Sequence, residues 1–236
     1  LYIKMESLYS IFFSYFEGLR LGMYTLMLST ILDNTLCQNE TNELIKEKPE
    51  LYFQGLQANY INLLGLAPIY YIIVYNYFLD LNKLQGDMTT NIIEFSIDYF
   101  GLVFIHNIGY YGMHVIMHKI NELKFIHNFH HLYKKTIPST GNAVSIYEFN
   151  FAYVLPFVGG AYLIHPSSQA MNASIMTISL LNIFIHTPAF KNIDYPKWLV
   201  SPGDHMKHHE TYSNTYAAPL LNIDYFVNNI QEKKEE

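Results

Sequence analysis

The stretch Tyr-Tyr-Gly-Met-His-Val-Ile-Met-His at residues 110–118, followed by His-Asn-Phe-His-His at residues 127–131, decides the expected fold. These two stretches hold five of the 11 histidines, and His-Met-Lys-His-His at residues 205–209 repeats the spacing of the second. Residues three or four positions apart lie on one face of a helix, so each cluster is predicted to present its imidazoles together. Because neutral imidazole is the commonest metal ligand among protein side chains, the three clusters are predicted to converge on one metal centre.

The composition around these clusters is that of a membrane protein. Of 236 residues, 50% are hydrophobic and 14% are charged, whereas soluble domains average about 25% charged residues. The mean hydropathy of +0.08 is modest because 21 tyrosines and many asparagines lower it without preventing burial at an interface. A net charge of −6 excludes a broad basic surface for nucleic acid. The single cysteine, Cys37, excludes an internal disulfide framework.

Apolar segments long enough to cross a hydrocarbon core, which needs about 20 residues, recur along the chain. They predict an all-α, polytopic helical membrane protein, with helices over residues 8–32, 56–81, 92–117, 147–165 and 169–187. Glu17 and Arg20 interrupt the first segment, which therefore either spans the membrane or lies on its surface. The last two segments form a hairpin that either crosses fully or only dips into the bilayer.

The distribution of basic residues predicts the orientation. With alternating spans, residues 33–55, 118–143 and 188–236 fall on the same side as all three histidine clusters. This side holds 11 of the 14 basic residues: Lys46, Lys48, Lys119, Lys124, Lys134, Lys135, Lys191, Lys197, Lys207, Lys233 and Lys234. The positive-inside rule then predicts a His-rich cap on the cytosolic face.

The number and type of candidate ligands narrow the chemistry. The eight histidines of the three clusters exceed what one ion can bind, so two ions sharing them is the expected arrangement. Structural zinc sites usually include cysteines, and this chain has no second one. An all-nitrogen site at a membrane suits non-haem iron that activates O2.

With these features, the chain resembles the fatty acid hydroxylase/sterol desaturase superfamily of membrane enzymes over residues 92–226. Residues 110–118 and 127–131 resemble its first two histidine boxes, and Trp-Leu-Val-Ser-Pro at 198–202 with residues 205–209 resembles the last. Asn-Ile-Phe-Ile-His-Thr-Pro at 182–188 resembles the segment that ends a late span with a ligand histidine. Asn-Thr-Tyr-Ala at 214–217 and Ile-Asp-Tyr-Phe at 223–226 resemble the closing motif.

The resemblance implies an O2-dependent lipid-modifying oxidoreductase that hydroxylates or desaturates a fatty acyl, sterol or related lipid. It implies two iron ions, which zinc can replace in purified material, and no catalytic residue beyond the metal ligands. The implied ligands are His114, His118, His127, His130, His131, His186, His205, His208 and His209. Electrons would come from an external NAD(P)H/cytochrome b5-type donor, because the chain has no GxGxxG fingerprint and no fused haem module. An internal membrane such as the endoplasmic reticulum is the expected location.

The expected organisation is a single integrated domain. Residues 1–91 form N-terminal membrane helices and loops, residues 92–226 form the catalytic region, and residues 227–236 form a polar tail. The alternative reading is a diverged non-catalytic protein, or a zinc-binding protein of the same fold that is structural or hydrolytic.

The chain also departs from the family's pattern. Ser145 stands where many members carry a histidine three residues before a glutamate, here Glu148, and the closing motif lacks the usual glycines. Asn182 stands where others carry a histidine or an amide. His106 is expected to line a substrate cavity or to pair with Asp98 or Glu94. The candidates for weaker ligation, or for orienting a ligand, are Asn182, Asp204, His106 and Glu148.

Overall fold

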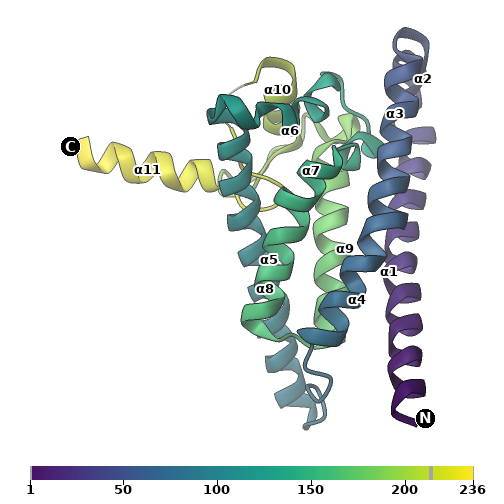
Figure 1. Cartoon of the computed structure of the whole chain (residues 1–236). Helices are drawn as coiled ribbons and strands as arrows, with labels where there is room; N and C mark the ends of the chain where they lie inside the picture. The colour runs from purple at the N-terminus through teal and green to yellow at the C-terminus, as the bar shows by residue number, and fades with distance from the viewer. Residues whose placement is uncertain (1, 213–214, 236) are drawn as a thin grey trace.

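Long helices lie side by side in the computed structural model, which describes residues 2–212 and 215–235, with side chains for 8–212 and 215–230 (Figure 1). The bundle consists of α1 (Tyr2–Asn34), α3–η1–α4 (Pro49–Asn59, Tyr60–Leu66, Ala67–Tyr77), α5 (Met88–Lys119), α7–η5–α8 (Ile146–Glu148, Phe149–Val154, Leu155–Ile164) and α9 (Ser168–Ile185). Its described residues contain no strand, only an isolated bridge between Leu199 and Leu221. The all-α prediction is confirmed.

Three of these helices are long and apolar enough to cross a membrane, namely Pro49–Tyr77, Met88–Lys119 and Ser168–Ile185. The chain is therefore a polytopic helical membrane protein, as predicted. α1 lies alongside α4, and α8 and α9 form a hairpin packed alongside α5 (Figure 1). That hairpin turns at His165, which is in the left-handed conformation, and α9 begins after Ser167, whose side chain accepts a hydrogen bond from the Ala170 N–H.

Two glycines explain how closely α1 approaches its neighbour. A Cβ atom on Gly18 would lie 2.7 Å from Tyr71 Cβ, and one on Gly22 would lie 2.1 Å from the Leu63 carbonyl oxygen. Small residues four positions apart allow helix backbones in a membrane to come this near. Gly18 and Gly22 thus lie in the contact between α1 and the η1–α4 segment. The prediction of the membrane helices from hydropathy did not use this pair of glycines.

The three histidine clusters and His186 lie at one end of the bundle, where α5 and α9 finish (Figure 1). This cap contains α2 (Gln38–Glu47), η2 (Asn121–Leu123), α6 (Lys124–Asn128), η3 (His130–Leu132), η4 (Pro138–Asn142), η6 (Pro188–Phe190) and α10 (Pro202–Thr211). α11 (Ile223–Glu235) extends away from the bundle. Asn214 of the predicted closing motif lies outside the described residues.

Buried side chains tie the cap to the membrane helices. Asp33 at the end of α1 accepts a hydrogen bond from the Ser139 N–H at 3.0 Å. Asn59 of α3 donates to the Ser139 carbonyl, and Asn62 of η1 donates to the Val144 carbonyl, both at 2.9 Å. These hydrogen bonds therefore attach the loop that follows the second histidine box to α1 and α3–η1.

At the opposite end of the bundle, the acidic residues of α5 have structural partners. Lys83 Nζ lies 2.8 Å from Asp98 Oδ1, and Asp98 Oδ2 accepts a hydrogen bond from the Ser167 N–H. Glu94 accepts a hydrogen bond from the Leu84 N–H at 3.1 Å. These contacts join α5 to its two neighbouring turns and leave both carboxylates far along the helix from the cap.

Candidate metal centre

The fold brings all nine predicted ligand histidines together in two adjacent groups. Within each group, one nitrogen of every ring lies within 4.8 Å of the others. We call these the first group (His114, His118, His127, His131 and His208) and the second group (His130, His186, His205 and His209). All are buried except His118, which is partly buried.

The two groups do not follow the clusters in the sequence. His127 and His131 belong to the first group, whereas His130 between them belongs to the second. The prediction that residues 127–131 share one helical face is wrong, because α6 ends at Asn128 and a 3₁₀ turn begins at His130.

α10 is a regular helix over the third cluster, and it still serves both groups. His205 and His209, one turn apart, face the second group, and His208 faces the first. The helix therefore lies across the two groups and joins them.

Backbone carbonyls determine the tautomers of three rings. His114 Nδ1 donates to the Tyr216 carbonyl at 2.7 Å, and His186 Nδ1 donates to the Asn182 carbonyl at the same distance. His130 Nδ1 faces the Ala143 carbonyl at 3.4 Å. A carbonyl oxygen can only accept, so each of these Nδ1 atoms carries the proton and each Nε2 presents a bare lone pair.

Those bare nitrogens face other nitrogens. His130 Nε2 and His186 Nε2 lie 3.3 Å apart, although neither has a proton to share. In the first group, His114 Nε2 lies 2.8 Å from His127 Nε2, 3.1 Å from that of His118 and 3.2 Å from that of His208. One lone pair cannot satisfy three such neighbours, and two lone pairs facing each other repel. A cation between the rings removes both conflicts, so the residues fit metal ions in both groups.

Burial keeps the rings of the cap neutral. It lowers the pKa of the imidazoles outside the membrane helices well below the ordinary value of about 6.5, and repulsion from neighbouring imidazoles adds to the effect in His127, His130, His131, His205 and His209. The pKa of His186 is lowered to about 4, also by burial. At neutral pH these rings can bind a cation without first losing a proton.

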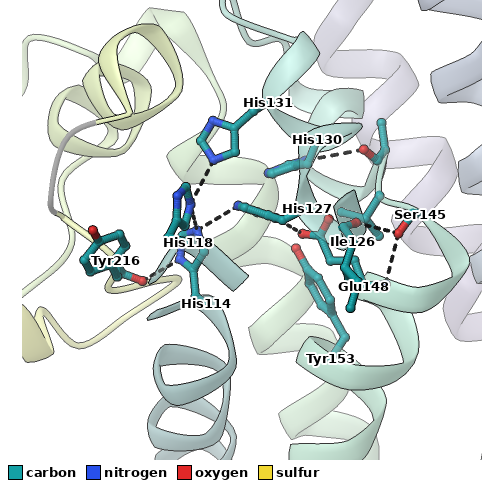
Figure 2. Close-up of polar contacts among 12 residues, drawn as sticks. His114, His118, Ile126, His127, His130, His131, Ser145, Glu148, Tyr153 and Tyr216 are labelled. Carbon is teal, nitrogen blue, oxygen red and sulfur yellow. Dashed lines mark hydrogen bonds and ion pairs between the residues drawn. The ribbon is translucent and has the colours of Figure 1, made fainter. Parts of the chain in front are cut away.

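Glu148 orients a ring of the first group. It is fully buried, and its Oε1 lies 2.7 Å from His127 Nδ1 (Figure 2). Ser145 caps the helix that presents this carboxylate, accepting a hydrogen bond from the Glu148 N–H. The Ser145 hydroxyl donates in turn to the Ile126 carbonyl, beside His127, at 2.7 Å. Ser145 thus holds together the two segments that present Glu148 and His127, although it offers no imidazole.

The other candidate residues lie farther from the rings. The Asn182 side chain donates to the Gly141 carbonyl, while its backbone oxygen accepts from His186. Asp204 is exposed, and its carboxylate accepts a hydrogen bond from Ser201 at the start of α10. His106 belongs to neither group and lines a cavity in the membrane part of the bundle.

Two contacts with the rings were not anticipated from the sequence. The Tyr216 carbonyl sets the tautomer of His114, and any residue type could supply that oxygen. The Tyr212 ring stacks on His131 with centroids 4.5 Å apart. Tyr212 directly follows α10 in the left-handed conformation, which residue type alone does not indicate.

A family model described as fatty acid hydroxylase matches residues 99–229, more than half of the chain. The matched range contains all nine histidines of the two groups. No curated protein and no solved structure matches the chain.

Proposed function

Because the chain belongs to the fatty acid hydroxylase family, we propose that it is an O2-dependent oxidoreductase that hydroxylates or desaturates a fatty acyl, sterol or related lipid. The two histidine groups would hold a pair of iron ions as its centre.

The observation that carries the proposal is the pairing of bare imidazole nitrogens in two neighbouring groups. Neutral nitrogen donors without thiolates suit iron in oxygen chemistry, and iron bound there would supply the oxidising power to attack an unactivated C–H bond. The protein's own residues bind, orient and shield: Glu148 and the backbone carbonyls fix the ring orientations, and the burial of the rings excludes bulk water.

The partners and the location follow from the same reasoning. We propose an external electron donor of the NAD(P)H/cytochrome b5 type, since the sequence carries no dinucleotide fingerprint of its own. We propose that the cap faces the cytosol from an internal membrane such as the endoplasmic reticulum. The concentration of basic residues on the histidine side supports that orientation.

The test is lipid profiling of cells that express the wild-type chain, His208→Ala or Lys207→Ala. Lys207 is the exposed neighbour of His208 on α10, so it is a matched control for expression and folding. The wild type and Lys207→Ala are expected to form the same oxidised lipid, and His208→Ala is expected to form none. Iron content and O2 consumption of freshly purified protein accompany the profiles.

The alternatives give different results. Zinc without iron in fresh protein, together with no O2 consumption, would favour a structural or hydrolytic zinc site. A cellular effect that survives both His130→Ala and His208→Ala would favour a non-catalytic relative.

A further inference from the structure

A cavity lies in the membrane part of the bundle, and its cap end lies beside the second group. Its empty space, including the mouth, is about 820 Å³. The cap end is lined by Asn142, Phe149 and Tyr153, and the cavity continues between α1, α4, α8 and α9 as far as Val74 and Met171. Gly141, which precedes Asn142, lies against the second group, since a Cβ on Gly141 would be 3.0 Å from His186 Nδ1. Asn142 is therefore a neighbour of that group.

The wall of the cavity is apolar except at a few points, and most of those have partners within the protein. The Thr25 hydroxyl donates to the Leu21 carbonyl, and the Tyr71 hydroxyl donates to Asn172. Two polar atoms do not: His106 Nδ1 and Asn142 Nδ2 are buried and have no hydrogen-bond partner among the described residues. Buried polar atoms are nearly always hydrogen-bonded, so an unpartnered one facing a cavity indicates a missing ligand group.

His106 Nδ1 has no hydrogen-bond partner among the described residues of its own helix. Its ring is only 2% exposed and lies among aromatic rings, with centroids 6.2 Å from Tyr110 and 6.4 Å from both Tyr153 and Phe157. The acidic residues of α5, Asp98 and Glu94, are bound to the turns at the far end of the bundle. Within the part of the chain that the structure describes, nothing supplies a hydrogen-bond donor or acceptor to Nδ1.

We propose that the cavity holds the apolar body of the lipid substrate and that His106 hydrogen-bonds a hydroxyl or carbonyl oxygen on that lipid, remote from the carbon to be oxidised. This rests on the proposed function for the choice of substrate, and it assigns His106 as a specificity-determining residue. An unsubstituted acyl chain would leave the buried nitrogen unpartnered and would bind less well.

The spacing along α5 defines the lipid further. His106 lies eight residues before His114, which is about 12 Å along the helix. The Tyr110 ring lies between the two, with centroids 6.2 Å and 5.4 Å from the rings of His106 and His114. We therefore expect the substrate to carry its oxygen about 12 Å from the reacting carbon, the length of two turns of α5. A hydroxylated polycyclic lipid and an acyl chain with a mid-chain oxygen both satisfy this distance.

The test measures equilibrium binding to the metal-loaded full chain in nanodiscs, with two pairs of probes. Cholesterol is compared with its 3-deoxy analogue cholestene, and 12-hydroxystearate with stearate. The wild type is expected to bind the oxygenated member of one pair about 5-fold to 100-fold more tightly, the effect of pairing a buried polar group. The pair that shows the preference identifies the source of the oxygen.

Variants of the cavity then assign the preference to His106. His106→Phe keeps an aromatic ring and is expected to abolish the preference, whereas His106→Gln retains a hydrogen-bonding group and keeps part of it. Phe157→Leu, which changes the apolar wall beside His106, is expected to weaken both members of a pair alike.

Equal wild-type affinities within both pairs would overturn the proposal, as would a preference that persists in His106→Phe. The first result needs no variant, so the test stands even if a substitution prevents folding. Binding is read without turnover, so a preference that depends on His106 would stand even if no lipid oxidation were found. Conversely, oxidation lost in His208→Ala with no role for His106 would overturn this inference alone.

Discussion

Replacing Glu148 with glutamine tests how the first group is built. Glutamine has nearly the shape of glutamate but carries no charge, so it weakens the single 2.7 Å contact to His127 Nδ1 with little change in packing. Among the described residues, no carboxylate contacts the second group, whose oriented rings donate to the backbone carbonyls of Ala143 and Asn182. The loss should therefore be confined to one of the two proposed metal ions.

The magnitude follows from the role of the contact. Removing the partner that orients a ligand histidine weakens metal affinity about 10-fold to 100-fold, or about 1.4 to 2.7 kcal/mol. Metal per chain is measured by elemental analysis after dialysis against increasing chelator. The metal content of Glu148→Gln should fall from two ions per chain to one. This loss should occur at a chelator concentration about 10 to 100 times lower than the concentration that removes an ion from the wild type.

A matched carboxylate provides the control. Asp204 is exposed and directly precedes His205, a ligand of the second group, and its carboxylate accepts a hydrogen bond from Ser201. Asp204→Asn removes the charge of this carboxylate. It should release metal at the same chelator concentration as the wild type. Tight retention of both ions by Glu148→Gln, or loss of both together, would refute the reasoning.

Three further outcomes are expected. Because burial lowers the pKa of the cap histidines, the unfolded chain binds more protons than the folded chain below pH 6.5. The free energy of unfolding of metal-free protein should therefore fall by up to about 1.4 kcal/mol per pH unit for each ring as the pH drops from 7.5 to 5.5, and the melting temperature should fall with it; a flat profile would contradict this. Gly22→Ala should destabilise the protein by about 1 to 3 kcal/mol in thermal melts, because its Cβ would meet the Leu63 carbonyl. Gly159→Ala, with open space around its Cβ, should be neutral or stabilising, and equal effects of the two would argue against close α1 packing. Ser145→Ala removes a helix cap and the link to Ile126, so it should lower stability by about 1 kcal/mol and loosen metal from the first group, and unchanged chelator resistance would show that the link does not position His127.

Local patterns in the sequence were sufficient for the architecture. Hydropathy averaged over about 20 residues is set by neighbours in the chain, so the predictions for 92–117 and 169–187 agree with α5 and α9 to within a few residues. The prediction for 56–81 was less accurate, because the helix α3–η1–α4 runs over Pro49–Tyr77. Histidine spacing is equally local. It identified eight of the nine histidines that form the two groups, whereas His186 was indicated only by the family resemblance. That resemblance is confirmed by the family match.

The sequence did not reveal how those residues would be shared. His130 and His131 are adjacent in the chain yet face different groups, because the chain leaves the α-helix at Asn128 and packs against both α9 and α10. In the sequence, Ser145 stands at a position where many family members carry a histidine. Only its contacts with the Ile126 carbonyl and the Glu148 N–H show that it holds together the segments of His127 and Glu148.

The sequence by itself determined the membrane helices, the metal-binding residue types and the family. Tertiary structure alone decided the division of ligands, the orientation of the rings by Glu148 and backbone carbonyls, and the place of His106 in a cavity. The physical reason is distance along the chain. Helix periodicity and hydropathy depend on residues a few positions apart, whereas these contacts join segments tens of residues apart, and helix packing determines which of them meet.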